Sequence, residues 1–327
     1  MTQHRAVLGR PVEAIPAARR PKPGPVAILP EAADSLADAV IAGGGTVGDL
    51  SSETRGLIWR GFRDGDALAT VLDEHPDIGW VQLPLAGIEC FGSAIATHPN
   101  LVWTSAKGAF AQPVAEHALT LTLALLRELP KRILATTWTT RKSGTSLYGL
   151  QVLIVGAGGI AIELIRLLEP YGVHVTVVRR TADPVASADR TVSAEHFLDV
   201  LPEADVVVLA AAATATTKNL IGETELTIMK DTAILVNVAR GSLVDTDALA
   251  GALASRLIAG AGIDVTDPEP LPDGHPLWEE PNIIITPHVA DTPEMVEPLI
   301  AERVRANVVA LHGDGRFEGV VDTATGY

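Results

Sequence analysis

The chain has 327 residues, of which 47% are hydrophobic and 20% charged, and its formal net charge is −15. This length suits about two domains with a sizeable core. The acidic balance argues against a nucleic-acid binder, because such proteins usually carry a basic stripe. The single cysteine, Cys90, excludes a disulfide framework and a cysteine-based zinc site. Because no signal peptide is visible, we expect a cytoplasmic protein.

Two further classes of protein are disfavoured by the sequence. The apolar stretch "HALTLTLALLREL", residues 117–129, is too short to span a bilayer and carries charge at its end, so it predicts a buried helix. No histidine pair has the spacing of a helical metal site, so we expect no bound metal. Neither a membrane nor a nucleic acid is therefore an expected partner.

The first part of the chain alternates short apolar runs with longer amphipathic ones. Residues 1–25 are rich in proline and arginine and predict a mobile arm or an extended surface strap. The apolar runs that follow predict strands at 26–30, 56–62, 79–87 and 101–105, and the amphipathic runs predict helices at 32–44 and 65–76. Such alternation favours a parallel sheet covered on both faces.

A long apolar helix is predicted at 114–133, and a second series of strands and helices follows it. Strands are expected at 151–159, 173–180, 204–212, 233–240, 258–265 and 282–288, with a helix at 160–172 and a last helix at 293–315. The fold class predicted from this pattern is α/β with two units, the second running roughly from residue 105 to 286.

A glycine-rich turn joins the first strand and helix of the second unit. Gly156, Gly158 and Ala161 form Gly-x-Gly-x-x-Ala, in which the glycines allow a tight turn and the close approach of a pyrophosphate. Gly159 and Ile160 open the helix and are expected to contact the cofactor. The motif alone is weak, because glycine turns are common, but the flanking strand, helix and strand are the context of a dinucleotide site.

Three polar residues end predicted parallel strands, at the sheet edge where ligands bind in open α/β folds. They are Arg240 in "AILVNVAR", Asp264 in "AGAGID" and His288 in "NIIITPH". Each taken singly has a structural explanation, such as helix capping or a satisfied polar side chain. Glu269, in a proline-rich loop, reads on its own as an exposed carboxylate. Three such residues beside a dinucleotide turn predict an active site.

Several segments together resemble the NAD(P)-dependent D-isomer-specific 2-hydroxyacid dehydrogenases. The segments are "GLQVLIVGAGGIA", "NVARGSLVDTDALAGAL", "AGAGIDVTDPEPLPDGHPLW", "PNIIITPHVA" and, in the long helix, "VAEHALTLTLALLREL". The resemblance is dense from Val114 to Ala290 and looser around "WVQLPLAGIE". It implies a Rossmann-type doubly wound cofactor domain at 105–286, with a flavodoxin-like substrate domain built from both chain ends, 1–104 and 287–327.

The resemblance implies a catalytic set of Arg240, Glu269 and His288. Arg240 would grip the substrate carboxylate and polarise the keto oxygen through its donor fork. His288 would donate a proton to that oxygen as hydride arrives. Glu269 would hydrogen-bond the imidazole and favour its charged form. Because Glu269 is not glutamine, the resemblance also points away from the formate dehydrogenase branch.

The same resemblance implies residues that bind the cofactor and the substrate. Asp264 matches the residue that holds the nicotinamide carboxamide, and Ala239 is expected to contact the cofactor. Ala86 and Gly87, in "PLAGIE", match a loop whose main-chain amides bind the substrate carboxylate.

The strand "VHVTVVRR" ends in arginines where a dinucleotide-binding unit usually has an acidic residue for the ribose hydroxyls. Arg179 and Arg180, with Thr181 as a further donor, are placed to bind a 2′-phosphate, so we expect NADP (NADPH) to be favoured. The alternative is that both arginines are solvated loop residues and NAD is used.

The leading functional hypothesis is an oxidoreductase that transfers hydride between NAD(P)H and a small 2-oxo acid, such as glyoxylate or hydroxypyruvate. A second hypothesis is a non-catalytic nucleotide sensor like the corepressors built on this fold. A third is another dehydrogenase chemistry on the same scaffold, such as phosphite oxidation. Relatives usually dimerise through the cofactor domain, so a homodimer is expected.

Overall fold

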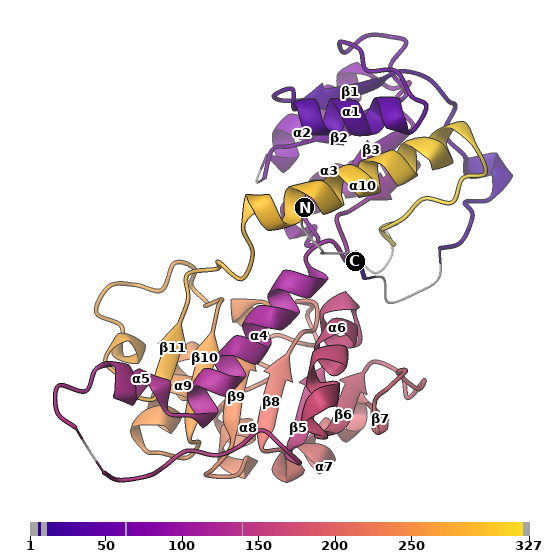
Figure 1. Ribbon diagram of the computed structural model, residues 1–327. Helices are drawn as coiled ribbons and strands as arrows, with labels where there is room; N and C mark the ends of the chain where they lie inside the picture. Colours follow the sequence, from indigo (N-terminus) through magenta and orange to yellow (C-terminus); the bar gives the residue numbers. More distant parts are fainter. Residues whose placement is uncertain (1–5, 8–11, 63, 139, 323–327) are drawn as a thin grey trace. The chain divides into compact units, whose positions relative to one another are not determined.

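The computed structural model describes residues 6–7, 12–62, 64–138 and 140–322. The chain divides into two compact units (Figure 1), with unit 1 formed by residues 1–110 and 292–327 and unit 2 by residues 111–291. These breaks fall a few residues beyond the expected ones at 104/105 and 286/287. Residues 1–5 and 8–11 of the expected N-terminal arm lie outside the described residues.

Unit 1 contains a four-stranded parallel sheet in the order β1-β2-β3-β4. Val47 forms an isolated parallel bridge with Val26, which adds a short fifth member beside β1. The sheet then has the strand order 2-1-3-4-5 of flavodoxin-like folds. The strands are β1 Val26–Leu29, β2 Gly56–Trp59, β3 Trp80–Gln82 and β4 Val102–Thr104.

Helices cover both faces of this sheet, because apolar side chains alternate along buried strands. Even-numbered residues such as Val26 and Ile28 pack against α1 and α10, and odd-numbered ones such as Ala27 and Leu57 pack against α2 and α3. Helix α10 lies alongside α1 (Figure 1), so the C-terminal part of the chain completes unit 1. The helices are α1 Asp34–Ala42, α2 Gly65–Glu74, α3 Gly92–Thr97 and α10 Pro293–His312.

Unit 2 contains a seven-stranded parallel sheet in the order β11-β10-β9-β8-β5-β6-β7. The chain starts at β5, moves outward to β6 and β7, and returns to β8 on the other side of β5. This reversal is the switch point at which Rossmann-type sheets bind dinucleotides. The strands are β5 Gln151–Val155, β6 His174–Arg179, β7 Arg190–Ser193, β8 Val206–Leu209, β9 Ile234–Asn237, β10 Gly260–Ile263 and β11 Ile283–Ile285.

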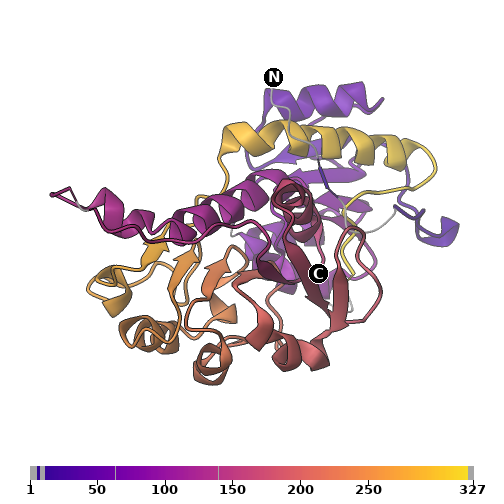
Figure 2. The same ribbon diagram turned by 60° about the horizontal axis from the view of Figure 1, so that its bottom comes forward.

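Both faces of the second sheet are also covered by helices. Helices α4 and α6 pack against each other on one face, as Figures 1 and 2 show, and α7, α8 and α9 contribute to the core on the other. The predicted α/β class, with a Rossmann-type and a flavodoxin-like unit, is confirmed. The helices are α4 Ala111–Leu126, α5 Leu129–Ile133, α6 Gly159–Leu168, α7 Phe197–Val200, α8 Glu223–Ile228 and α9 Thr246–Ala254.

Two local predictions were wrong. The helix expected at 114–133 is broken into α4 and α5, with Glu128 at a φ of 51° between them. Pro130 cannot donate to the carbonyl of Leu126, which accepts a hydrogen bond from the Thr145 amide instead. The edge strand β7 was missed because its four residues, "RTVS", contain one valine and no apolar run.

Arg303, on α10, fixes the C-terminal part of unit 1 from the inside. Its side chain is fully buried, and it donates to the carbonyls of Ser105 and Lys107 and to the Glu318 carboxylate, at 2.7, 2.6 and 3.1 Å. Burial lowers the pKa of the guanidinium, and the nearby charge of Glu318 opposes that shift. These contacts take the place of the hydrogen bonds to water that the guanidinium loses when it is buried.

Arg303→Met is expected to lower the free energy of unfolding by about 3 kcal/mol, because Glu318 and two carbonyls lose their donor. Chemical denaturation monitored by circular dichroism measures this loss. The matched control is Arg316→Met, which removes an exposed pair with Asp314 and is expected to change stability by less than about 0.5 kcal/mol. A loss below about 1 kcal/mol for Arg303→Met would contradict the assignment.

Candidate active site

The glycine-rich turn lies between β5 and α6, at the switch point of the unit 2 sheet. Gly156 has a φ of 115°, and a Cβ there would lie 2.5 Å from the carbonyl oxygen of Ala210, so a side chain is excluded. A Cβ on Gly158 would meet no atom within 4 Å, which leaves open space over the turn. Gly159 and Ile160 begin α6, whose first amides have no intrahelical acceptor. The turn therefore fits a bound pyrophosphate.

The strand next to β5 ends at the predicted phosphate-binding residues. Arg179 is the last residue of β6, one position beyond Val178, whose carbonyl accepts from the Gly156 amide at 2.8 Å. Arg179 Nη1 donates to the carbonyl of Asp183 at 3.2 Å, and Thr181 Oγ1 donates to the Asp183 carboxylate at 2.7 Å. Arg180 follows directly in the same exposed turn. The arginines thus lie beside the glycine turn.

The predicted catalytic residues lie on the other half of the same sheet edge. Strands β9, β10 and β11 are neighbours, and their last residues pair in register. Arg240 and His288 each come three residues after their strand ends, and Asp264 comes one residue after its own. The topology therefore brings the three residues to one edge, as parallel strands with a common register require.

His288 and Glu269 form a direct pair. The distance from His288 Nδ1 to Glu269 Oε1 is 2.8 Å, and the side chains are 46% and 34% exposed. Hydroxyls of Thr246 and Thr266 bind the main chain of residues 267–268 and hold the loop that carries Glu269. Because Nδ1 faces the carboxylate, the ring's Nε2 is left to exchange a proton with a substrate.

The buried carboxylate of Asp264 anchors the segment that carries His288. Its Oδ1 accepts from the Thr286 hydroxyl at 2.6 Å and from the Val289 amide at 3.0 Å, while Oδ2 accepts from the Ala290 amide at 3.2 Å. The His288 amide donates to the main-chain carbonyl of Asp264 at 2.8 Å. These bonds hold His288 at a φ of 55°, which a non-glycine residue adopts only with support.

Arg240 follows a tight turn at the end of β9. Asn237, fully buried, accepts from the Ala239 amide at 3.1 Å and donates to the Arg240 carbonyl at 3.0 Å. A Cβ on Gly241 would overlap the carbonyl of Thr266, so only glycine fits at this position beside the loop after β10. The turn fixes the backbone from which the half-buried Arg240 side chain extends.

A third carboxyl group lies close to the His288 segment. Partial burial raises the pKa of Asp291; the charge of His288 opposes the shift and that of Asp264 adds to it. Asp291 was not among the predicted site residues, because nothing in its sequence context distinguishes it from a loop acid.

Ala86 and Gly87 lie in unit 1, in the loop after β3, and both are half-buried. The carbonyl of the preceding Leu85 accepts from the Ala106 amide at 3.0 Å, which fastens the loop to the chain after β4. The loop follows the carboxyl end of its strand, the position from which α/β sheets bind ligands.

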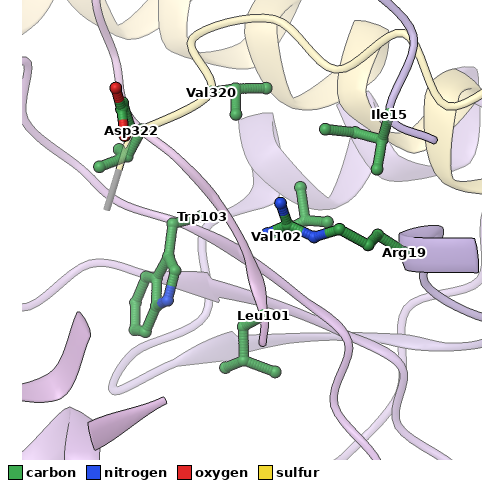
Figure 3. Close-up of a pocket in the computed structure, with 8 residues that line it drawn as sticks. Ile15, Arg19, Leu101, Val102, Trp103, Val320 and Asp322 are labelled. Atoms are coloured by element: carbon green, nitrogen blue, oxygen red, sulfur yellow. The ribbon is translucent and has the colours of Figure 1, made fainter. Parts of the chain in front are cut away.

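A hollow of about 190 Å³ lies elsewhere in unit 1 (Figure 3) and contains none of the predicted site residues. It includes Leu101 and Val102, at the amino end of β4, and the side chains of Arg19 and Asp322.

Within the described ranges, no cluster of three or more His, Cys, Asp or Glu side chains could hold a metal. Of the described helices, none is long and apolar enough to cross a membrane.

Comparison with known proteins assigns the chain to a protein family. The sequence profile of the "D-isomer specific 2-hydroxyacid dehydrogenase, NAD binding domain" matches residues 119–290. The chain belongs to the D-isomer specific 2-hydroxyacid dehydrogenase family. The turn, the arginines and the His288–Glu269 pair all lie within the matched residues, so unit 2 carries the NAD binding domain of a nicotinamide-dependent oxidoreductase.

Individual relatives agree with this assignment. An uncharacterized protein from Corynebacterium melassecola is 38% identical over 263 residues, covering 78% of this chain and 86% of the relative. Glyoxylate reductase from Thermococcus gammatolerans is 33% identical over 279 residues, covering 78% and 82%. A D-isomer specific 2-hydroxyacid dehydrogenase from Xanthobacter autotrophicus, solved with NADPH and MES, shares the fold with a TM-score of 0.80 at 24% identity, covering 93% and 100%.

Proposed function

We propose that this dehydrogenase reduces a small 2-oxo acid of the glyoxylate or hydroxypyruvate type to the D-2-hydroxy acid, with NADPH as the preferred hydride donor. The observation that carries the proposal is the 2.8 Å pair of His288 and Glu269, at the sheet edge that also holds Arg240 and the glycine turn. Similarity to a glyoxylate reductase at 33% identity supports a short substrate.

The protein's own residues divide the reaction between them. Arg240 binds the substrate carboxylate and polarises the keto oxygen, and main-chain amides of Ala86 and Gly87 bind the carboxylate as the family resemblance implies. His288 donates the proton that turns the keto oxygen into a hydroxyl, with Glu269 orienting its ring. NADPH held by unit 2 would supply a hydride, which together with the proton from His288 accounts for the reduction of the keto group.

The cofactor has a suitable set of residues in unit 2. The open space over Gly158 and the first amides of α6, from Gly159 and Ile160, suit the pyrophosphate. Ala239 and Asp264 lie past β9 and β10, where we place the nicotinamide end. The Asp264 carboxylate already accepts hydrogen bonds from the 286–290 segment, and these bonds hold it in place. The same carboxylate would then also contact the nicotinamide carboxamide.

The NADPH preference rests on the end of β6. A carboxylate at this position would bind the ribose hydroxyls of NAD and repel a 2′-phosphate, whereas Arg179 stands here with Arg180 and Thr181 after it. The carboxylate of Asp183, in the same loop, already accepts from Thr181. Two arginines and one carboxylate leave this strand end with a net positive charge, which favours the phosphorylated cofactor.

The enzyme is expected to show a higher kcat/KM with NADPH than with NADH. Replacing Arg179 and Arg180 together with Ala should lower kcat/KM for NADPH at least about ten- to a hundredfold, because losing even one charge-assisted bond to phosphate costs about 1.5–3 kcal/mol. The value for NADH should change little. Arg190→Ala is the control, because that exposed arginine begins β7 and pairs with Glu203. Equal kcat/KM values for both cofactors in the unsubstituted enzyme would overturn the preference.

His288→Asn is expected to abolish reduction of glyoxylate and hydroxypyruvate, because asparagine cannot transfer the proton, while NADPH binding stays nearly unchanged. Steady-state kinetics and a fluorescence titration with NADPH measure the two effects separately. The control is His196→Asn, at an exposed histidine that contacts Asp199. Substantial turnover by His288→Asn would remove this residue from its role. A wild-type protein that binds NADPH but reduces no 2-oxo acid would instead favour the nucleotide-sensor alternative.

We also propose a homodimer formed through unit 2. Ile133, Leu134 and Trp138, at the end of α5 and just after it, are 76%, 78% and 95% exposed, which is unusual for large apolar side chains so close in sequence. A second copy of this chain is the occupant we assign to this surface, because relatives usually dimerise through the cofactor domain.

Replacing Leu134 and Trp138 with Ser is expected to shift the protein from dimer to monomer in sedimentation velocity experiments, since their apolar contact area would be lost. Tyr148→Ser serves as a control, because that tyrosine is 67% exposed but contacts Tyr171 of its own unit. A wild-type protein that sediments as a monomer at micromolar concentration would refute the proposed dimer.

A further inference from the structure

Helix α4 packs directly against strand β10, where two glycines of the strand face it. A Cβ on Gly262 would lie 3.0 Å from Leu121 Cβ and 3.2 Å from Leu125 Cδ1, and a Cβ on Gly260 would lie 3.3 Å from Leu125 Cδ2. Leu121 and Leu125 are four residues apart and share one face of the helix. Gly260 and Gly262 are two residues apart and share one face of the strand.

The next position on each face is polar. One turn before Leu121 stands His117, and two residues after Gly262 stands Asp264. His117 Nε2 lies 2.9 Å from Thr286 Oγ1 and 3.6 Å from Asp264 Oδ1, and the histidine side chain is 19% exposed. The close approach of α4 therefore places His117 against Thr286, which begins the His288 segment, and against Asp264, which anchors it.

The direction of these hydrogen bonds follows from the chemistry of the groups. A carboxylate only accepts hydrogen bonds, so the Thr286 hydroxyl donates its proton to Asp264 Oδ1, with 2.6 Å between the two oxygens. The Thr286 oxygen can then only accept from the ring, so His117 Nε2 carries the proton in this contact. The result is a chain of donors, from His117 through Thr286 to Asp264.

We infer that His117 is a positioning residue for His288, acting through Thr286 and Asp264 on the segment that holds the catalytic ring. Without the His117 donor, the Thr286 oxygen loses the hydrogen bond that it accepts. Its own bond to Asp264 Oδ1, the oxygen that also accepts from the Val289 amide, is then no longer held in place from α4. The segment then no longer holds His288 in its left-handed backbone conformation against Glu269. This inference rests on the proposed role of His288 as proton donor.

The decisive comparison is between two replacements of His117. His117→Gln keeps an N–H donor at about the position of Nε2 and is expected to retain kcat within about threefold of the unsubstituted enzyme. His117→Leu keeps the volume but loses the donor, and its kcat is expected to fall about tenfold or more, as losing a hydrogen bond to a charge-linked network would produce. Its affinity for NADPH should change by less than about threefold.

A double-mutant cycle tests the route of the effect. If His117 acts through Thr286, the double variant His117→Leu with Thr286→Val should be no slower than Thr286→Val alone. Melting temperatures of all variants, and His196→Leu as a surface histidine control, separate this effect from general loss of structure. A role in helix packing alone would give Gln and Leu variants with equal kcat, and that outcome, or additive losses in the cycle, would overturn the inference.

Nuclear magnetic resonance of the histidine rings gives a readout that needs no turnover. The Cε1–H signal of His288, assigned by its loss in His288→Asn, should move or broaden in His117→Leu and stay near its wild-type position in His117→Gln. An unchanged His288 signal in His117→Leu would refute the positioning role even if the enzyme reduces 2-oxo acids. A protein that reduces none of them, yet shows the signal change, would refute only the proposed function.

Discussion

The part of the sheet edge proposed to be catalytic depends on the hydrogen bonds made by the buried carboxylate of Asp264. A carboxylate at the end of an interior strand is costly to bury unless its oxygens are hydrogen-bonded. Here the Thr286 hydroxyl and the amides of Val289 and Ala290 supply those bonds. The same bonds tie the chain after β11 to the end of β10. Burial of one charge thus fixes the backbone that presents His288.

The rest of unit 2 is arranged so that this anchor is possible. Gly260 and Gly262 bring α4 down onto β10, and Gly241 lets the chain after Arg240 pass the carbonyl of Thr266. In each case the absence of a side chain allows two backbones, or a helix and a strand, to approach more closely than a Cβ permits. Gly156, in the glycine-rich turn, acts in the same way against the carbonyl of Ala210 at the switch point. Close approach therefore shapes both halves of the site.

The two halves of the sheet edge divide the chemistry. The residues proposed to bind phosphate, from Gly156 to Thr181, lie at or just after the ends of β5 and β6, and those proposed to transfer the proton and bind the carboxylate follow β9, β10 and β11. A dinucleotide spans such an edge with its adenosine and nicotinamide ends apart. In the proposed function, the arginines at the end of β6 consequently act on the choice of cofactor, and the His288–Glu269 pair acts on the substrate.

The sequence by itself determined the α/β class, the strands that Arg240, Asp264 and His288 follow, and the glycine turn. These features are local: strand periodicity, a strand-to-helix turn and the residue at a strand end are written in a few consecutive positions. The prediction failed at the helix break, although Pro130 is a local signal for it. It also failed at β7, where the local signal is weak and tertiary contacts decide. Only the tertiary structure could join His117 to Thr286, 169 residues apart, and make Asp264 an anchor. Such contacts depend on how closely α4 packs on β10, and no short stretch of sequence contains both partners.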